Sequence, residues 1–196
     1  MSLALVALVL ATAGCADGVG APLTAPVTVA DGRDHGTPQN FQAHLSGDEE
    51  VPSRETLAQG NAKFQLSKDG QSLHYKLIAS NIENAFMAHI HLAPAGANGG
   101  IVVWLYGTPP ASNVPASSQV RHDGVLAEGT ITKANFIGTL AGKEMADLFA
   151  AIRAGNAYVN VHTRNLAIPA GPTMPLVPGN YPGGEVRGQI DHGNGM

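Results

Sequence analysis

From residue 41 onward, apolar and polar residues alternate in a series of short segments. Alternation with a period of two is typical of a β-strand, since successive side chains point to opposite faces of a sheet. Turn-forming residues separate the segments, and the turn SKDGQS between the second and the third favours a hairpin. The pattern predicts about eight strands, within residues 41–47, 61–67, 72–80, 87–93, 100–106, 125–132, 157–163 and 184–190.

The segment GKEMADLFAAIRAGN has a different period. Its large apolar residues have the spacing of one face of an α-helix, and they are Met145, Leu148, Phe149 and Ile152. Gly155 stands where such a helix would end. We therefore expect an all-β fold, an antiparallel sandwich or barrel of about eight strands with one short helix that caps one end.

The composition agrees with this fold and excludes some functions. The 196 residues include 24 glycines and 13 prolines, and only 13% of the residues are charged. The chain has a net charge of −4 and no run of basic residues. It therefore lacks the positive surface that binding to nucleic acid requires, and we expect no nucleic-acid partner. No apolar run reaches the ~18 to 20 residues of a membrane span.

The N-terminal segment MSLALVALVLATAGC, residues 1–15, has the apolar core and the small residues of a signal peptide. Its Cys15, the only cysteine of the chain, follows TAG, and the segment resembles the lipobox of bacterial lipoproteins. We expect export to the cell envelope or periplasm, with membrane contact only through a lipid on Cys15. The alternative is ordinary secretion, with Cys15 removed or left as a free thiol. Residues 16–40 predict a flexible tether, and residues 41–192 predict the folded domain.

Three of the predicted strands carry reactive polar residues on one face and apolar residues on the other. These polar residues are His89 and His91 in MAHIHLA, Asn160 and His162 in AYVNVHT, and Glu185 and Arg187 in GEVRGQI. If the three strands are neighbours, the side chains share one surface. Three neutral imidazoles form a good ligand set for Cu or Zn, so His89, His91 and His162 are the predicted metal ligands. The alternative is an ordinary polar sheet face that water covers.

The residues beside the histidines allow more than one role. Glu185 is a candidate fourth ligand or a group that orients a ligand, together with Asn160. Arg187 is a candidate partner of Glu185 in a forked pair, or a site for an anion. The other histidines, His44 and His74 among them, are expected to be solvated, and the carboxylates of residues 48–50 are expected in an exposed turn.

Four sequence blocks resemble the chordin-type, or CHRD, domain. They are FQAHLSGDEEVPS, AHIHLAPAGANGGIVVWL, IRAGNAYVNVHT and YPGGEVRGQI, in the order that the family shows over residues 41–190. The resemblance implies an immunoglobulin-like β-sandwich or barrel and favours one site that the three polar strands share. It implies no enzymatic activity. This chain departs from the family pattern by the insertion RNLAIPAGPTMPLVPG, residues 164–179.

Three functions remain open from the sequence. The first is an exported envelope module that binds Cu or Zn through its histidines and acts on an unknown protein or envelope component. The second is a structural or adhesive module, without metal, that binds protein or polysaccharide. The third is a metalloenzyme like copper–zinc superoxide dismutase, whose His-x-His strand matches only AHIH and part of a glycine turn. Our prediction is a binding protein and not an enzyme.

Overall fold

The computed structural model describes residues 40–107, 120–168, 171 and 174–192. The predicted signal peptide, Cys15 and residues 16–39 of the predicted tether lie outside the described residues. The last residue of the predicted tether, Asn40, begins the first strand.

All eight predicted strands are present, and a two-residue strand follows them. The strands are β1 (Asn40–Ser46), β2 (Gln59–Leu66), β3 (Leu73–Glu83), β4 (Ala85–Leu92), β5 (Gly100–Tyr106), β6 (Arg121–Ile131), β7 (Tyr158–Thr163), β8 (Val186–Gln189) and β9 (Asp191–His192). The ninth strand was not predicted from the sequence; its residues Asp191 and His192 pair with Gln42 and Phe41.

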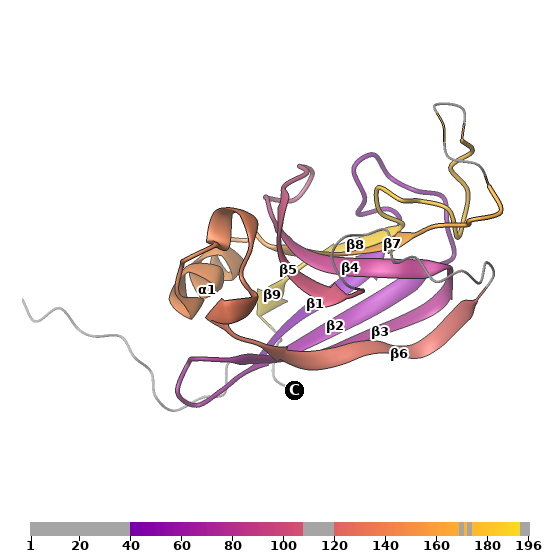
Figure 1. The fold of residues 1–196 in the computed structure, drawn as a ribbon. Helices are drawn as coiled ribbons and strands as arrows, with labels where there is room; N and C mark the ends of the chain where they lie inside the picture. The colour runs from indigo at the N-terminus through magenta and orange to yellow at the C-terminus, as the bar shows by residue number, and fades with distance from the viewer. Residues whose placement is uncertain (1–39, 108–119, 169–170, 172–173, 193–196) are drawn as a thin grey trace, which may run out of the picture. The chain divides into compact units, whose positions relative to one another are not determined.

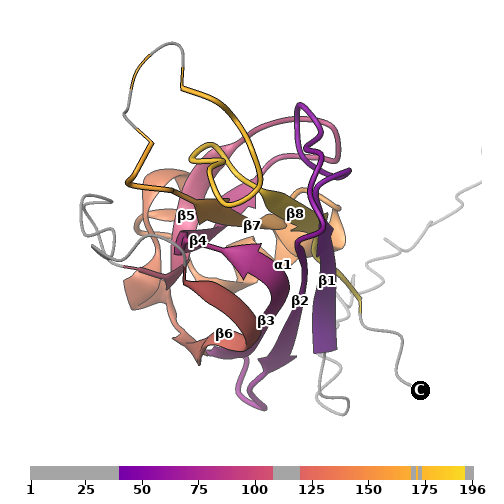
Figure 2. The same cartoon turned by 90° about the vertical axis from the view of Figure 1, so that its right-hand side faces the viewer.

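The strands form one antiparallel sheet in the order β5-β4-β7-β8-β1-β2-β3-β6, with β9 beside β1. This sheet curls into a nearly closed barrel, so that β5 and β6, its two edges, approach each other (Figures 1 and 2). The predicted all-β class, a sandwich or barrel with one helix, is confirmed.

A tyrosine side chain bridges the gap between the two edges. Tyr75 of β3 is paired in register with Gly129 of β6, and its hydroxyl donates to the carbonyl of Leu105 on β5 at 2.7 Å. A Cβ atom at Gly129 would lie 3.0 Å from the Tyr75 ring. The glycine therefore leaves the room that the ring needs to cross β6 and reach the other edge.

The interior of the barrel is filled by the apolar halves of the alternating strands, including Leu45, Leu77, Ile90 and Val159. Helix α1 (Met145–Arg153) covers one end of it, as Figure 1 shows. The four residues of its predicted apolar face are all buried, and the ring of Phe149 stacks on that of Phe41 at 6.2 Å. The predicted helix is thus confirmed, and Gly155 ends it with a φ of +69°. Two short 3₁₀ turns, η1 (Lys133–Asn135) and η2 (Gly138–Leu140), precede α1.

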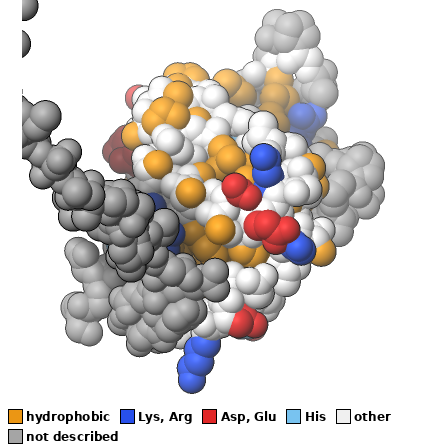
Figure 3. Space-filling view, turned by 90° about the vertical axis from the view of Figure 1, so that its left-hand side faces the viewer, with side chains coloured by type: hydrophobic (Ala, Val, Ile, Leu, Met, Phe, Trp, Pro, Cys, Tyr) orange, Lys and Arg blue, Asp and Glu red, His pale blue; other side chains and the backbone are white. Residues whose placement is uncertain are grey.

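No helix among the described residues combines the length and the apolar character needed to cross a bilayer. On the face that Figure 3 shows, acidic and basic side chains are interspersed among apolar ones and do not gather into a patch of one sign.

The bridge from Tyr75 to Leu105 predicts the first measurable effect. Replacing Tyr75 by Phe should lower the free energy of unfolding by about 1 kcal/mol, because one partly buried hydrogen bond is lost while the ring is kept. Urea unfolding of the variant and of the parent protein measures the difference. Tyr106→Phe is the control, since it removes a hydroxyl from β5, the edge strand that carries the acceptor Leu105, and leaves the bridge intact. Equal stability of the Tyr75 variant and the parent would contradict a closing role for this bond.

Candidate metal centre

The polar face of β4, β7 and β8 is buried, although it points away from the barrel core. Three loops lie over it, formed by residues 47–58, 93–99 and 179–184 (Figure 1). They also contact one another, since Asn98 Nδ2 donates to the carbonyl of Val51 at 2.8 Å and the Tyr181 hydroxyl donates to that of Glu55 at 3.2 Å. The alternative of a polar face covered by water is therefore wrong, because the loops turn this face into a second buried layer.

The three histidines predicted from the sequence meet under these loops. β4 pairs with β7, which places His89 opposite Asn160. His162 lies two residues further along β7 and therefore points to the same face. The ring centroids lie 5.5 Å apart for His89 and His91, 5.0 Å for His89 and His162, and 6.0 Å for His91 and His162. One nitrogen from each ring falls within 4.8 Å of the others, so the three residues can hold a metal ion.

Backbone carbonyls fix which nitrogen of two rings carries the proton. His162 Nδ1 lies 3.0 Å from the carbonyl of Pro182, and His91 Nδ1 lies 3.0 Å from that of Gly99. A carbonyl can only accept, so each Nδ1 is the donor and each Nε2 keeps its lone pair. His89 Nδ1 lies 3.2 Å from His162 Nε2 and is then the donor of that pair.

This arrangement leaves two imidazole nitrogens buried without a hydrogen-bond partner, Nε2 of His89 and Nε2 of His91. Buried polar atoms are almost always paired, because an unpaired one loses its hydration without compensation. Each of these two nitrogens carries a lone pair that is buried from water. A metal ion is the kind of group that would satisfy them.

Burial also keeps the histidines neutral. Loss of hydration lowers the pKa of His89 to about 3, with a further contribution from His162 and His91. It lowers the pKa of His162 to about 4, although the bond to Pro182 opposes the shift. The pKa of His91 is lowered by burial too, and the charge of Arg187 adds to that effect. At neutral pH the three side chains are therefore in the unprotonated form that binds metals.

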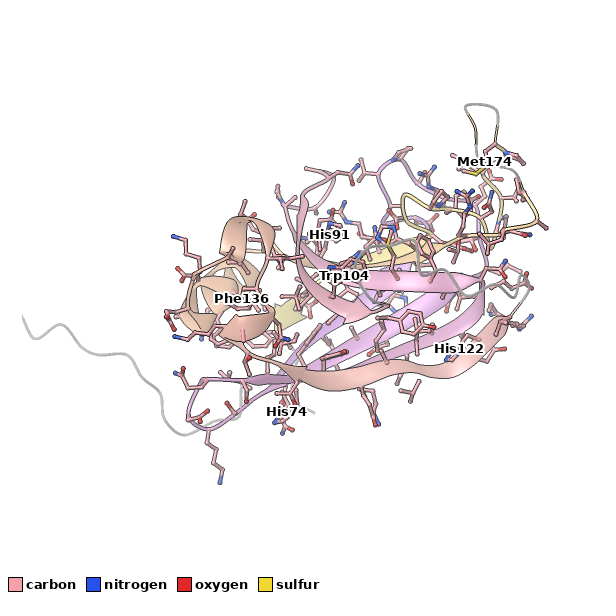
Figure 4. All side chains as sticks on the ribbon, viewed as in Figure 1. His74, His91, Trp104, His122, Phe136 and Met174 are labelled. Carbon is pink, nitrogen blue, oxygen red and sulfur yellow. The ribbon has the colours of Figure 1, made fainter. Side chains whose placement is uncertain are left out.

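Aromatic rings surround the histidines. Trp104 on β5 packs against His89 in a T-shaped arrangement with ring centroids 4.2 Å apart, and Tyr158 stacks on His91 at 4.9 Å with an interplanar angle of 9°. Figure 4 shows His91 and Trp104 near each other at β4 and β5. These rings limit the access of water to the cluster and hold two of the imidazoles in place.

Arg187 positions the loop that orients His91. Its guanidinium lies 3.5 Å from the centre of the Tyr158 ring and donates to the carbonyl of Pro94 at 3.2 Å and to Asn98 Oδ1 at 3.3 Å. The amide of Gly99 donates to the Tyr158 hydroxyl at 3.1 Å. Of the two roles considered for Arg187, a forked pair with Glu185 is wrong, because the guanidinium is bound to this loop.

Glu185 secures the other side of the site. Its carboxylate accepts from the hydroxyls of Thr56 and Thr163, both at 2.6 Å, and from the amide of Gly179 at 2.9 Å. It joins the 47–58 loop and the 179–184 loop to β7, next to His162. Its oxygens are occupied by these three donors, and it does not belong to the three-histidine group.

Glu50 is a buried member of this layer that sequence reasoning missed. Asn160 Nδ2 donates to its two oxygens at 3.1 and 3.3 Å. Gly184 has a φ of +124°, and a Cβ atom there would lie 2.5 Å from Glu50 Oε1. Burial raises the pKa of Glu50 to about 7, although Arg187 and Arg54 oppose the shift. The expectation of an exposed turn at residues 48–50 is therefore wrong for Glu50, and the glycine before Glu185 was the only local signal of this close packing.

The remaining candidate residues lie apart from the cluster. His44 and His74 are exposed, as predicted, and His122 is half-buried with its Nε2 at 2.9 Å from the carbonyl of Val125. Figure 4 shows His74 and His122 away from His91, and Met174 on the long loop between β7 and β8. The three histidines predicted as ligands are thus the ones that the fold brings together.

The raised pKa of Glu50 predicts a pH-dependent stability. A carboxyl group with a folded-state pKa above the unfolded value stabilises the protein at low pH, and this contribution is lost as the pH rises from 4.5 through about 7. Between pH 5 and pH 8 the parent protein should therefore lose about 2 kcal/mol of unfolding free energy relative to Glu50→Gln. Urea unfolding at the two pH values measures the difference. Glu49→Gln, at an exposed position, is the control. If both variants changed the pH dependence of stability by the same small amount, the raised pKa of a buried Glu50 would be contradicted.

The sequence of the chain was compared with curated proteins and with models of protein families. No curated protein matches the chain. The family model of the CHRD domain matches residues 41–167, a range that includes β1 from its second residue, all of β2 to β7 and the three histidines of the cluster. β8, with Glu185 and Arg187, lies beyond the matched range. The chain belongs to the CHRD domain family.

Proposed function

We propose that this protein is an exported module of the cell envelope that binds one Cu or Zn ion through His89, His91 and His162. The observation that carries the proposal is the pair of unpaired, buried lone pairs on His89 and His91, beside the Nε2 of His162. A sheet face without a ligand role would be expected to pair or expose such atoms.

The chemistry of the donors supports these metals. Neutral imidazole nitrogen is a common ligand of both Cu and Zn, whereas Ca and Mg prefer oxygen. The ligand nitrogens now lie within 4.8 Å of one another, and nitrogens bound to one metal at about 2.0 Å lie at most about 4 Å apart. Small rotations of the imidazoles therefore suffice to close the site.

The surroundings match those of known metal ligands in one further respect. Metal-binding histidines usually donate their second ring nitrogen to a carbonyl or a carboxylate, which fixes the ring and makes it a better ligand. His91 and His162 do so through Gly99 and Pro182. The two carbonyls come from the loops that close the site, so ligand orientation depends on loop closure.

The proposed location and anchor rest on the N-terminal sequence. Residues 1–15 have the pattern of a signal peptide, and Cys15 has the position of a lipidated cysteine. A metal site on a tethered domain in the envelope would exchange its ion with a neighbouring protein or envelope component. Membrane contact through the lipid alone is part of the proposal.

A second candidate function is adhesion, and the long loop between β7 and β8 favours it. Leu166, Leu176 and Val177 of this loop are exposed by 44%, 49% and 41%. Large apolar side chains that a loop leaves exposed are candidates for contact with another protein. Adhesion that is lost when these three residues become Ser, but not when the histidines become Ala, would favour this second function.

A metal titration tests the proposed function. The full chain with Cys15→Ala is used, because a free thiol would itself bind metal. Addition of Cu(II) to the metal-free protein should quench the fluorescence of Trp104, the only tryptophan, because its ring packs on His89. Zn(II) binding is followed by competition with a coloured chelator. We expect one equivalent to bind, and the triple variant His89→Ala, His91→Ala, His162→Ala to lose at least about a hundredfold in affinity.

The matched control replaces three other histidines, His44, His74 and His122, by alanine. It removes as many imidazoles from the chain but leaves the cluster intact, and it should bind as the parent does. Near-UV circular dichroism shows whether each variant is folded. A folded cluster variant that binds either metal as tightly as the control would contradict the proposed function.

A further inference from the structure

We infer that the cluster is selective for monovalent copper, Cu(I), over Zn(II), and that the thioether of Met87 serves as its fourth, soft ligand. This inference rests on the proposed function, since it names the metal and completes the site. Three independent features of the described residues support it: the number of nitrogen ligands, the charge around them and the position of Met87.

The number of ligands favours Cu(I). Within the described part of the chain, the group of residues that can hold a metal contains three histidines and no cysteine or carboxylate. Zn(II) in closed protein sites is almost always bound by four ligands in a tetrahedron. Cu(I), with a filled d shell and a single charge, is stable with two or three nitrogen ligands and accepts sulfur readily.

The charge around the cluster also favours a monovalent ion. The three imidazoles are neutral, and the charged groups nearby are two carboxylates and two guanidinium groups, Glu50, Glu185, Arg54 and Arg187. Each has partners of its own: Glu50 binds Asn160, Glu185 binds two threonines and an amide, Arg54 lies 5.1 Å from the centre of the Tyr181 ring, and Arg187 holds the 93–99 loop.

These four groups carry no net negative charge even with Glu50 ionised, and neither carboxylate is free to neutralise a bound ion. The free energy needed to bury an ion grows with the square of its charge. The desolvation cost of a divalent ion is therefore about four times that of a monovalent ion of the same size. The positive charge of Arg187 is also close to the cluster, because the Tyr158 ring contacts both the guanidinium of Arg187 and the ring of His91. The surroundings therefore disfavour Zn(II) more than Cu(I).

Met87 stands at the position where a soft ligand would be needed. It precedes His89 by two residues on β4, so its side chain lies on the same face of the sheet. On the neighbouring strand it is paired in register with His162. Residues opposite each other in an antiparallel pair have Cβ atoms about 5 Å apart. The flexible, half-buried thioether of Met87 can therefore reach an ion that His162 holds.

Two competition experiments test the inference, both with full chain that carries Cys15→Ala. Cu(I) is kept reduced with ascorbate under argon and is competed against a coloured Cu(I) chelator, while Zn(II) is competed against a coloured Zn(II) chelator. We expect Cu(I) to bind at least about a hundredfold more tightly than Zn(II). Met87→Leu, which keeps size and apolar character, should weaken Cu(I) binding by at least about tenfold and leave Zn(II) binding unchanged.

Met174→Leu is the matched control, because it removes a thioether from the long loop and should change neither affinity. Thermal unfolding of the metal-free proteins shows whether the Met87 variant keeps the parent stability. Zn(II) binding as tight as that of Cu(I) overturns the selectivity but leaves the proposed function standing. A preference for Cu(I) that is unchanged in Met87→Leu overturns the role of Met87. If neither metal binds, the proposed function fails, and the inference fails with it.

Discussion

The closure of three loops over β4, β7 and β8 is the constraint on which the site depends. Closure removes water from a sheet face that carries histidine, asparagine and arginine, and every polar group there then needs a partner inside the protein. The loops supply most of these partners: Gly99 and Pro182 accept from the histidines, and Pro94 and Asn98 accept from Arg187. The loops leave three buried atoms of this face unpaired: Nε2 of His89, Nε2 of His91 and Oδ1 of Asn160.

The buried polar layer reduces stability. A neutral histidine and a buried carboxyl group lose hydration that their hydrogen bonds only partly replace, as the lowered pKa of His89 and the raised pKa of Glu50 show. Apolar residues would fill the same volume at less expense in free energy. Local features that oppose folding are most often found at functional sites, and here they are concentrated around the three histidines.

The sequence predicted the strands and the helix, because alternation and helical spacing are local patterns. Alternation also placed His89, His91 and His162 on the polar faces of their strands, but their meeting was predicted only on the condition that these strands are neighbours, which the pairing of β4 with β7 meets. The sequence did not predict that this face is buried. Glu50 binds Asn160 across 110 positions of the chain, and Thr56 binds Glu185 across 129. Loop contacts over such separations leave no periodic signal, and only the strained glycines beside the site, such as Gly184, hint at them.

The most direct test of the central claim is anomalous X-ray diffraction from crystals of the metal-loaded protein, with data collected on both sides of the copper and zinc absorption edges. The account predicts one strong anomalous peak, within bonding distance of a nitrogen from each of His89, His91 and His162. A peak at other residues, or an unoccupied cluster in crystals that hold the metal elsewhere, would contradict it.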